Sequence, residues 1–157
     1  MMKLFFWRKD VRLAVAEFVK LYGPVLFLDI DGVLHPHQRG TMELLPVLEA
    51  FLRAHPTVRV VISSTWRMQN SLEDLREFFA EDVRHQIEGV TPFINQTPFS
   101  RFQEITAYLL ETGSRRWCAL DDEAHLFPPE CANLVHTRAA AGVTPDDLLA
   151  VARILGV

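Results

Sequence analysis

Runs of apolar residues alternate along the chain with segments whose apolar positions recur every third or fourth residue. The apolar runs predict strands that are buried on both faces, over residues 25–30, 59–64, 117–120 and, more weakly, 87–90 and 133–136. The amphipathic segments predict helices over residues 9–22, 46–54, 71–80, 101–112 and from 145 onward. Strands and helices therefore alternate, which is typical of a parallel sheet with helices on both faces.

Several predicted helices begin at recognisable start signals. Ser71 and Thr144 each precede an acidic residue by three positions, which is the spacing of a capping box. Ser100 is expected to cap its helix in a similar way, with a glutamine three positions later. Pro46 and Pro145 suit the first turn of a helix, where no backbone donor is needed.

The composition is that of one globular domain. Of the 157 residues, 49% are apolar and 23% are charged, which allows a substantial core. The formal charge of −4 argues against a broad nucleic-acid-binding surface, because such a surface is usually basic. No linker or repeat divides the chain, so we expect a helical extension over residues 1–24 and a single domain over residues 25–157.

Two further features bear on where the protein works. Cys118 and Cys131 have neither a metal-binding spacing nor a disulfide framework, which suits reduced thiols. The apolar run near the N-terminus is too short for a signal peptide or a membrane span, and charged residues follow it at once. We therefore expect a cytoplasmic protein with no membrane partner.

The run LFLDIDGVLHP, residues 26–36, places two carboxylates at the end of a predicted buried strand. Side chains two positions apart in a strand point the same way, roughly 7 Å apart, so Asp29 and Asp31 would face one site. Two such acids call for a cation or a shared proton, and Gly32 permits a sharp turn. An acid-rich surface turn is the alternative. A buried strand that is followed by two acids and a turn is the layout of a metal-assisted phosphoryl site at the carboxyl end of a parallel sheet.

Three further polar signals follow predicted strands or begin a helix: Ser63 in VVISSTWR, Arg101 in SRFQEI, and Asp121 with Asp122 in CALDD. Together with DIDGVLHP, and in this order, these motifs resemble those of the haloacid dehalogenase (HAD) superfamily of phosphohydrolases. DIDGVLHP and ISSTWR are most similar to the HAD domains of "Swiss Army Knife" RNA repair proteins. The resemblance runs from about residue 25 to the C-terminus. It implies a doubly wound, three-layer α/β/α fold of HAD-like Rossmannoid type with a mostly parallel five-stranded sheet.

The resemblance also implies a role for each acid in a Mg²⁺-dependent phosphatase. Asp29 would attack the phosphorus and carry the phosphoryl group as an aspartyl-phosphate. Asp31 would protonate the leaving group and later activate water, while its backbone carbonyl contacts the metal. We expect Asp122 to bind the metal directly, with Asp121 behind it; a helix cap is the alternative for this pair. Mg²⁺ suits an all-oxygen site, and no cysteine or histidine cluster suggests zinc.

Two more positions would contact the phosphoryl group. The hydroxyl of Ser63 is expected to hydrogen-bond a phosphoryl oxygen, and Ser64 takes this place if the register differs by one. Arg101 falls in the first turn of a helix, where a cation is unfavourable unless it has an anionic partner. That partner would be phosphate or Asp29; a solvated surface arginine is the alternative.

Weaker candidates surround the site. Trp66 and Arg67 would bind a base and a phosphate of the substrate by stacking and charge, although a helix-packing tryptophan and a surface arginine fit the sequence equally well. His35 lies just beyond the turn and would reach the substrate, but we expect it to be an exposed loop histidine.

Superfamily members often carry a cap domain after the first strand or before the basic residue, and both segments are short here. The resemblance therefore implies a capless domain that acts on large substrates, such as a phosphorylated nucleic-acid end or a phosphoprotein. Two other classes are considered. A receiver domain would place its phosphoacceptor after the third strand and a lysine after the fifth, and this chain does neither. A non-catalytic metal-binding module of the same fold is the second.

Overall fold

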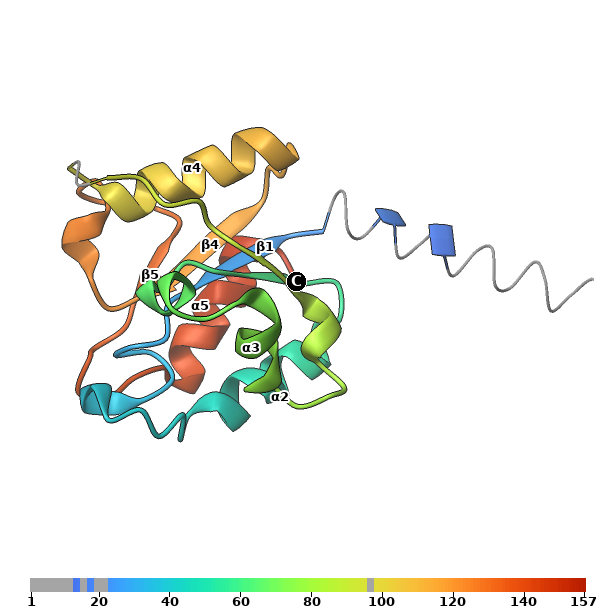
Figure 1. Cartoon of the computed structure of the whole chain (residues 1–157), viewed down its shortest axis with the longest axis horizontal. Helices are drawn as coiled ribbons and strands as arrows, with labels where there is room; N and C mark the ends of the chain where they lie inside the picture. Colours follow the sequence, from blue (N-terminus) through green and yellow to red (C-terminus); the bar gives the residue numbers. More distant parts are fainter. Residues whose placement is uncertain (1–12, 15–16, 19–22, 96–97) are drawn as a thin grey trace, which may run out of the picture.

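The computed structural model describes residues 13–14, 17–18, 23–95 and 98–157. Within them, five strands form one parallel sheet in the order β3-β2-β1-β4-β5, with β1 at the centre (Figure 1). The strands are β1 (Val25–Leu28), β2 (Arg59–Ile62), β3 (Ile87–Val90), β4 (Trp117–Asp121) and β5 (Leu134–His136). All five predicted strands are therefore confirmed, including the two weaker ones.

Helices cover both faces of the sheet (Figure 1). They are α2 (Leu45–Ala54), α3 (Leu72–Glu77), α4 (Ser100–Thr112) and α5 (Pro145–Leu155). In β1, Leu26 and Leu28 pack into the core cluster that includes α2, α3 and α5, whereas Val25 and Phe27 pack against α4. This alternation is the expected consequence of the two-residue period of a strand that is covered on both sides. The predicted three-layer α/β/α fold is confirmed.

The helix starts are partly as predicted. Capping boxes at Ser71 and Thr144 are confirmed. The predicted cap at Ser100 is wrong, because Phe99 occupies the cap position with φ 60° and Ser100 is the first helical residue. Helix α3 also ends before the predicted residue 80, since the backbone N–H of Ala80 donates to Glu49 Oε1 at 2.7 Å instead of continuing the helix.

The connections around the sheet's carboxyl edge are short. Residues 29–44 join β1 to α2 through a 3₁₀ turn, η1 (Pro36–Gln38), and residues 91–99 join β3 to α4. Neither connection holds a further domain in its described residues, in agreement with a capless fold. The helix predicted over residues 9–22 lies outside the described residues except at 13–14 and 17–18.

Two findings concern the expected surroundings of the protein. Cys118 is buried and Cys131 is half-buried, and both are free thiols. Burial raises the pKa of the Cys118 thiol to about 12, so this side chain is an unreactive part of the core. Among the helices of the described residues, none is both long enough and apolar enough to cross a membrane.

Candidate active site

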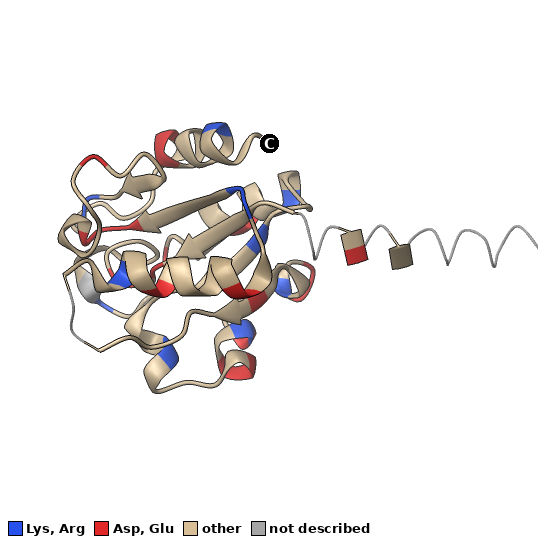
Figure 2. Ribbon diagram, turned by 90° about the horizontal axis from the view of Figure 1, so that it is seen from above, with Lys and Arg blue, Asp and Glu red and all other residues tan. Residues whose placement is uncertain are grey.

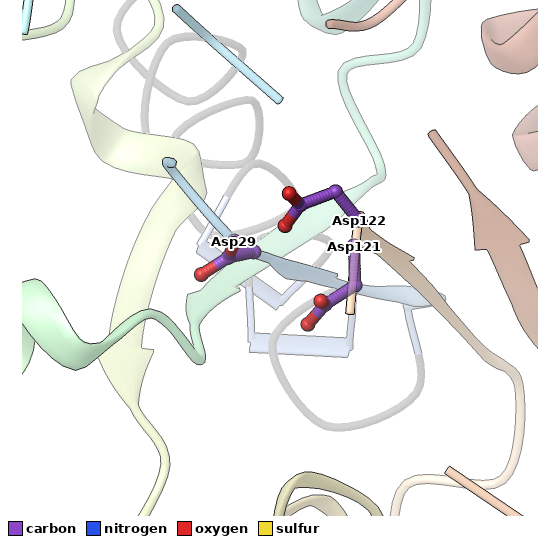
Figure 3. A group of neighbouring side chains, drawn as sticks. All are labelled: Asp29, Asp121 and Asp122. Atoms are coloured by element: carbon purple, nitrogen blue, oxygen red, sulfur yellow. The ribbon is translucent and has the colours of Figure 1, made fainter. Parts of the chain in front are cut away.

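The acids predicted to bind metal meet where β1 and β4 end. These strands are neighbours in register, with Leu28 opposite Leu120, so the residues that follow them arrive side by side. Carboxylate oxygens of Asp29, Asp121 and Asp122 all lie within 4.8 Å of one another (Figure 3). Asp29 and Asp121 are buried and Asp122 is half-buried. The cluster therefore brings together the side chains of three of the four predicted metal-binding residues.

Arg101 reaches this cluster from the first turn of α4. Its Nη1 donates to Asp29 Oδ1 at 3.1 Å and to Asp121 Oδ2 at 2.6 Å, and its side chain is 3% exposed. Asp29, one of the two anionic partners predicted for Arg101, is therefore in contact with it, and Asp121 is a further partner. The other oxygen of Asp121 accepts the backbone N–H of Glu123 at 2.9 Å. Both oxygens of Asp121 therefore already have a hydrogen-bond partner, whereas among the described residues no other side chain hydrogen-bonds the Asp122 carboxylate.

The cluster is short of positive charge. Burial raises the pKa of Asp29, while Arg101 and a hydrogen bond from the Ser64 side chain oppose the rise. Burial also raises the pKa of Asp121 to about 8 and that of Asp122 to about 6. The cluster thus holds three carboxylates, and its one guanidinium pairs with two of them, Asp29 and Asp121. A hard divalent cation with oxygen ligands would supply the missing charge, so these residues fit Mg²⁺.

This shortage of charge predicts how pH affects the metal-free protein. Near pH 5 the folded protein keeps protons on Asp121 and Asp122, whereas the unfolded chain has released them. Asp122 loses its proton as the pH rises through about 6, and Asp121 as it rises through about 8. The stability that these protons contribute to the folded state is lost with them. Mg²⁺ would bind the carboxylates in their ionised form. At pH 8, and at a concentration 100-fold above its Kd, we expect Mg²⁺ to raise the melting temperature of the protein by about 5–10 °C, and by less at pH 5.

Differential scanning fluorimetry in Mg²⁺ and in EDTA measures this rise in melting temperature, with Asp122→Asn as control. An equal rise at both pH values, or an undiminished rise in the control, contradicts it.

Gly32 shapes the turn beneath Asp122. Its φ is +69°, a region that residues with a Cβ rarely adopt, and a Cβ at this position would overlap the Asp122 carboxylate. Its carbonyl accepts the hydroxyl of Thr137 at 3.0 Å, which ties the turn to the segment after β5. The predicted sharp turn is confirmed, and glycine is required here for both conformation and space.

The structure separates the two candidate serines. Both are 1% exposed. The side chain of Ser64 hydrogen-bonds Asp29, and its Oγ also accepts the backbone N–H of Trp66 at 3.4 Å. The hydroxyl of Ser63 is buried and has no hydrogen-bond partner in the described part of the chain. It is therefore Ser64, the alternative register, that lies beside the candidate nucleophile.

Asp31 stands apart from the three-acid cluster and has its own partners. Trp66 Nε1–H donates to its Oδ2 at 3.0 Å, and His35 Nε2 lies 3.0 Å from its Oδ1. The His35 Nδ1 accepts the backbone N–H of Gly40 at 3.2 Å, so the neutral ring carries its proton on Nε2, beside Asp31. The expectation that His35 is exposed is wrong: it is 1% exposed, because the chain after Gly32 folds back and pairs Asp31 with His35.

Arg67 is not a solvated surface arginine, although it lines a pocket of about 220 Å³ together with Arg101. Its side chain is 4% exposed and donates to the backbone carbonyls of Ser63, Ser64 and Thr91 at 2.5–3.1 Å. Its Nη2 also lies 2.7 Å from a carboxylate oxygen of Glu104 on α4. These partners occupy most of its donors, so Arg67 holds the end of β2 against α4 rather than presenting a free cation to a substrate. Glu104 was missed by the sequence analysis, because nothing local marks it.

A pocket of about 390 Å³ adjoins Asp31. It is lined by Asp31 and by residues of one short segment, Thr65, Trp66, Met68, Gln69 and Asn70. That segment includes a 3₁₀ turn, η2 (Thr65–Met68), which directly follows the two serines. The pocket therefore opens on the Asp31 side of the candidate site.

Comparison with known proteins agrees with this geometry. The model of the family described as "HAD domain in Swiss Army Knife RNA repair proteins" matches residues 25–148. Searches of curated proteins and of solved structures returned no significant match. The matched region contains every candidate site residue named above, and the family supports a role of the hydrolase or phosphatase type. The chain belongs to the family of HAD domains found in Swiss Army Knife RNA repair proteins.

Proposed function

We propose that this protein is a Mg²⁺-dependent phosphomonoesterase in which Asp29 carries the phosphoryl group. The observation that carries the proposal is the buried carboxylate of Asp29, fixed by Arg101 and grouped with Asp121 and Asp122. A carboxylate needs no separate base to become a nucleophile. Membership of the HAD family supports a role of the hydrolase or phosphatase type.

The metal would be held by the carboxylates of Asp29 and Asp122 and by the backbone carbonyl of Asp31, as the resemblance implies. Asp121 would orient the site through its contact with Arg101. When bound, Mg²⁺ offsets the repulsion between the nucleophile and the phosphate and stabilises the charge of the transferring group. The surplus of carboxylates over cations in the cluster supports this requirement.

The reaction would proceed in two displacements. First, a carboxylate oxygen of Asp29 bonds to phosphorus while the bond from phosphorus to the leaving oxygen breaks, and Asp31 gives its proton to that oxygen. The product alcohol departs. Next, water attacks the phosphorus of the aspartyl-phosphate, Asp31 takes a proton from this water, and the bond from phosphorus to Asp29 breaks. Inorganic phosphate leaves, and both aspartates return to their starting states.

Two side chains would bind the phosphoryl oxygens. Ser64 and Arg101 already contact the Asp29 carboxylate, so both lie next to the atom that would accept the phosphoryl group. A hydroxyl and a guanidinium are strong donors to phosphate oxygens. Ser64 takes this role in our proposal in place of Ser63.

The substrate we favour is a phosphorylated nucleic-acid end. The capless site leaves room for a large substrate, and relatives of the family belong to RNA repair proteins. Acidic and basic residues are mixed over the described fold rather than gathered in one basic surface (Figure 2). Recognition would therefore be local, through the terminal phosphate and the first nucleotides, rather than through a long electrostatic track.

A panel of phosphate esters tests this proposal. We expect the protein to release p-nitrophenol from p-nitrophenyl phosphate in Mg²⁺ and to lose roughly 10²-fold or more of this rate in EDTA, because the metal contributes several kcal/mol to transition-state stabilisation. Oligonucleotides with a 5′- or 3′-phosphate should give kcat/KM values at least about 10-fold above those of sugar phosphates, since binding of the remote part of a substrate is used at the reacting centre.

Each part of this expectation can fail separately. Equal or faster turnover of sugar phosphates would overturn the choice of substrate but leave the phosphatase intact. Absence of turnover on the whole panel, in a protein whose melting temperature still rises in Mg²⁺, would instead favour the non-catalytic metal-binding module.

A further inference from the structure

We propose that His35 and Trp66 are positioning residues for Asp31: they hold its carboxylate at the wall of the adjoining pocket, which would receive the leaving group. This inference rests on the proposed phosphatase function for its catalytic meaning. The holding itself follows from the contacts of the three side chains.

Each oxygen of Asp31 has its own partner, and the two partners come from different segments. Oδ2 accepts the indole N–H of Trp66 at 3.0 Å, and Oδ1 lies 3.0 Å from Nε2 of His35. The last torsion of an aspartate side chain is normally broad. The hydrogen bond from Trp66 to one oxygen and the close contact of the His35 ring with the other restrict it, although the Asp31 side chain is 31% exposed to solvent.

Both rings are themselves fixed. His35 is buried and accepts a hydrogen bond from the backbone N–H of Gly40 at 3.2 Å. The Trp66 ring packs edge-on against Phe78, with 5.6 Å between centroids, and the backbone of Trp66 is held by Asn70 Nδ2 on its carbonyl at 2.9 Å. The rings therefore form a rigid support rather than two mobile contacts.

The placement of this support fits the task of Asp31. Asp31 and Trp66 line the same pocket of about 390 Å³, and none of the three clustered acids lines it. A proton donor acts only within about 2.6–3.2 Å of its target, and a misplacement of about 1 Å costs roughly 10²-fold in rate. Asp31 thus depends on its two neighbours for a geometry that its own backbone does not determine.

Leaving-group dependence separates positioning from a merely structural role. kcat/KM reports the steps up to departure of the alcohol. Trp66→Phe keeps the ring but removes the donor, and His35→Met removes the imidazole, whereas His35→Gln keeps an N–H near Nε2. We expect Trp66→Phe and His35→Met to lower kcat/KM about 10-fold or more on an alkyl phosphate, which needs protonation, and less than about 3-fold on p-nitrophenyl phosphate. His35→Gln should recover most of the kcat/KM that His35→Met loses.

Trp117→Phe is the matched control for Trp66→Phe, because the Trp117 ring packs against Phe27 and Phe102 and does not contact Asp31.

A second measurement needs no turnover. In ¹⁵N-labelled protein the indole N–H signal of Trp66, identified by its loss in Trp66→Phe, should shift and exchange faster with solvent in Asp31→Ala. An unmoved signal overturns the proposal, as does a loss of kcat/KM that is equal for both leaving groups. If the wild type hydrolyses no phosphate ester but the indole signal still changes in Asp31→Ala, the proposed positioning of Asp31 is supported and the proposed phosphatase function is refuted.

Discussion

Asp29→Asn is expected to lower Mg²⁺-dependent phosphate release by about 10³-fold or more, because the amide cannot take the place of a nucleophilic carboxylate. The substitution keeps the shape of the side chain and an oxygen for Arg101. It should not unfold the protein: burial raises the pKa of Asp29, so exchange for a neutral amide removes a group that is costly to bury in its charged form. We therefore expect the melting temperature of the metal-free variant to equal or exceed that of the wild type.

Asp31→Asn serves as the companion variant. It keeps the nucleophile and loses the acid and base, so p-nitrophenyl phosphate should still phosphorylate Asp29, and the phosphoenzyme should then hydrolyse slowly and accumulate. Acid-quenched samples with labelled substrate show the covalent phosphate directly. Phosphate release by Asp29→Asn near the wild-type rate would refute the assignment of the nucleophile.

Arg101→Met is expected to destabilise the fold by about 3–5 kcal/mol, because it leaves Asp29 and Asp121 buried without their shared cation. The pKa values of both acids are already raised by burial and would rise further without the guanidinium. The loss should therefore be greater at pH 8, where the carboxyls are forced to ionise, than at pH 5, where they hold protons. Urea denaturation at the two pH values measures it.

The matched control for this loss is Arg53→Met. Arg53 pairs with Asp82 at 2.6 Å and lies 3.4 Å from Glu49, but the side chains of Arg53 and Asp82 are 44% and 57% exposed, so its removal should cost much less than the removal of Arg101. Comparable losses in the two variants, or a greater loss for Arg101→Met at pH 5 than at pH 8, would show that Arg101 does not compensate buried carboxylates.

The parts of the fold that depend on residues close together in the sequence could be predicted from the sequence. The apolar run of β1 marks a strand that is covered on both faces, and the capping boxes at Ser71 and Thr144 satisfy helix donors within four residues of chain. One local prediction that failed, the end of helix α3, lies beside a contact that is distant in sequence. The backbone N–H of Ala80 is taken by Glu49, 31 positions earlier in the chain.

The acids of the candidate site were predictable because they lie at or just beyond the ends of β1 and β4, whereas the partners of those acids were not. Trp66 was expected to stack on a substrate or to pack against a helix, but its indole N–H donates to Asp31 across 35 positions in sequence. Arg67 was expected to bind a substrate phosphate or to lie at the surface, and no local pattern indicated its ion pair with Glu104. Contacts of this kind depend on which strands become neighbours, and no local pattern records them.

The central place of β1 makes the site all-or-none. Because β1 lies between β2 and β4, the segments that follow these three strands flank one another, and Asp29, Ser64 and Asp121 come together only when the three strands are paired. Local unfolding of β2 or β4, the two neighbours of β1, would therefore abolish the activity of the site rather than reduce it partially.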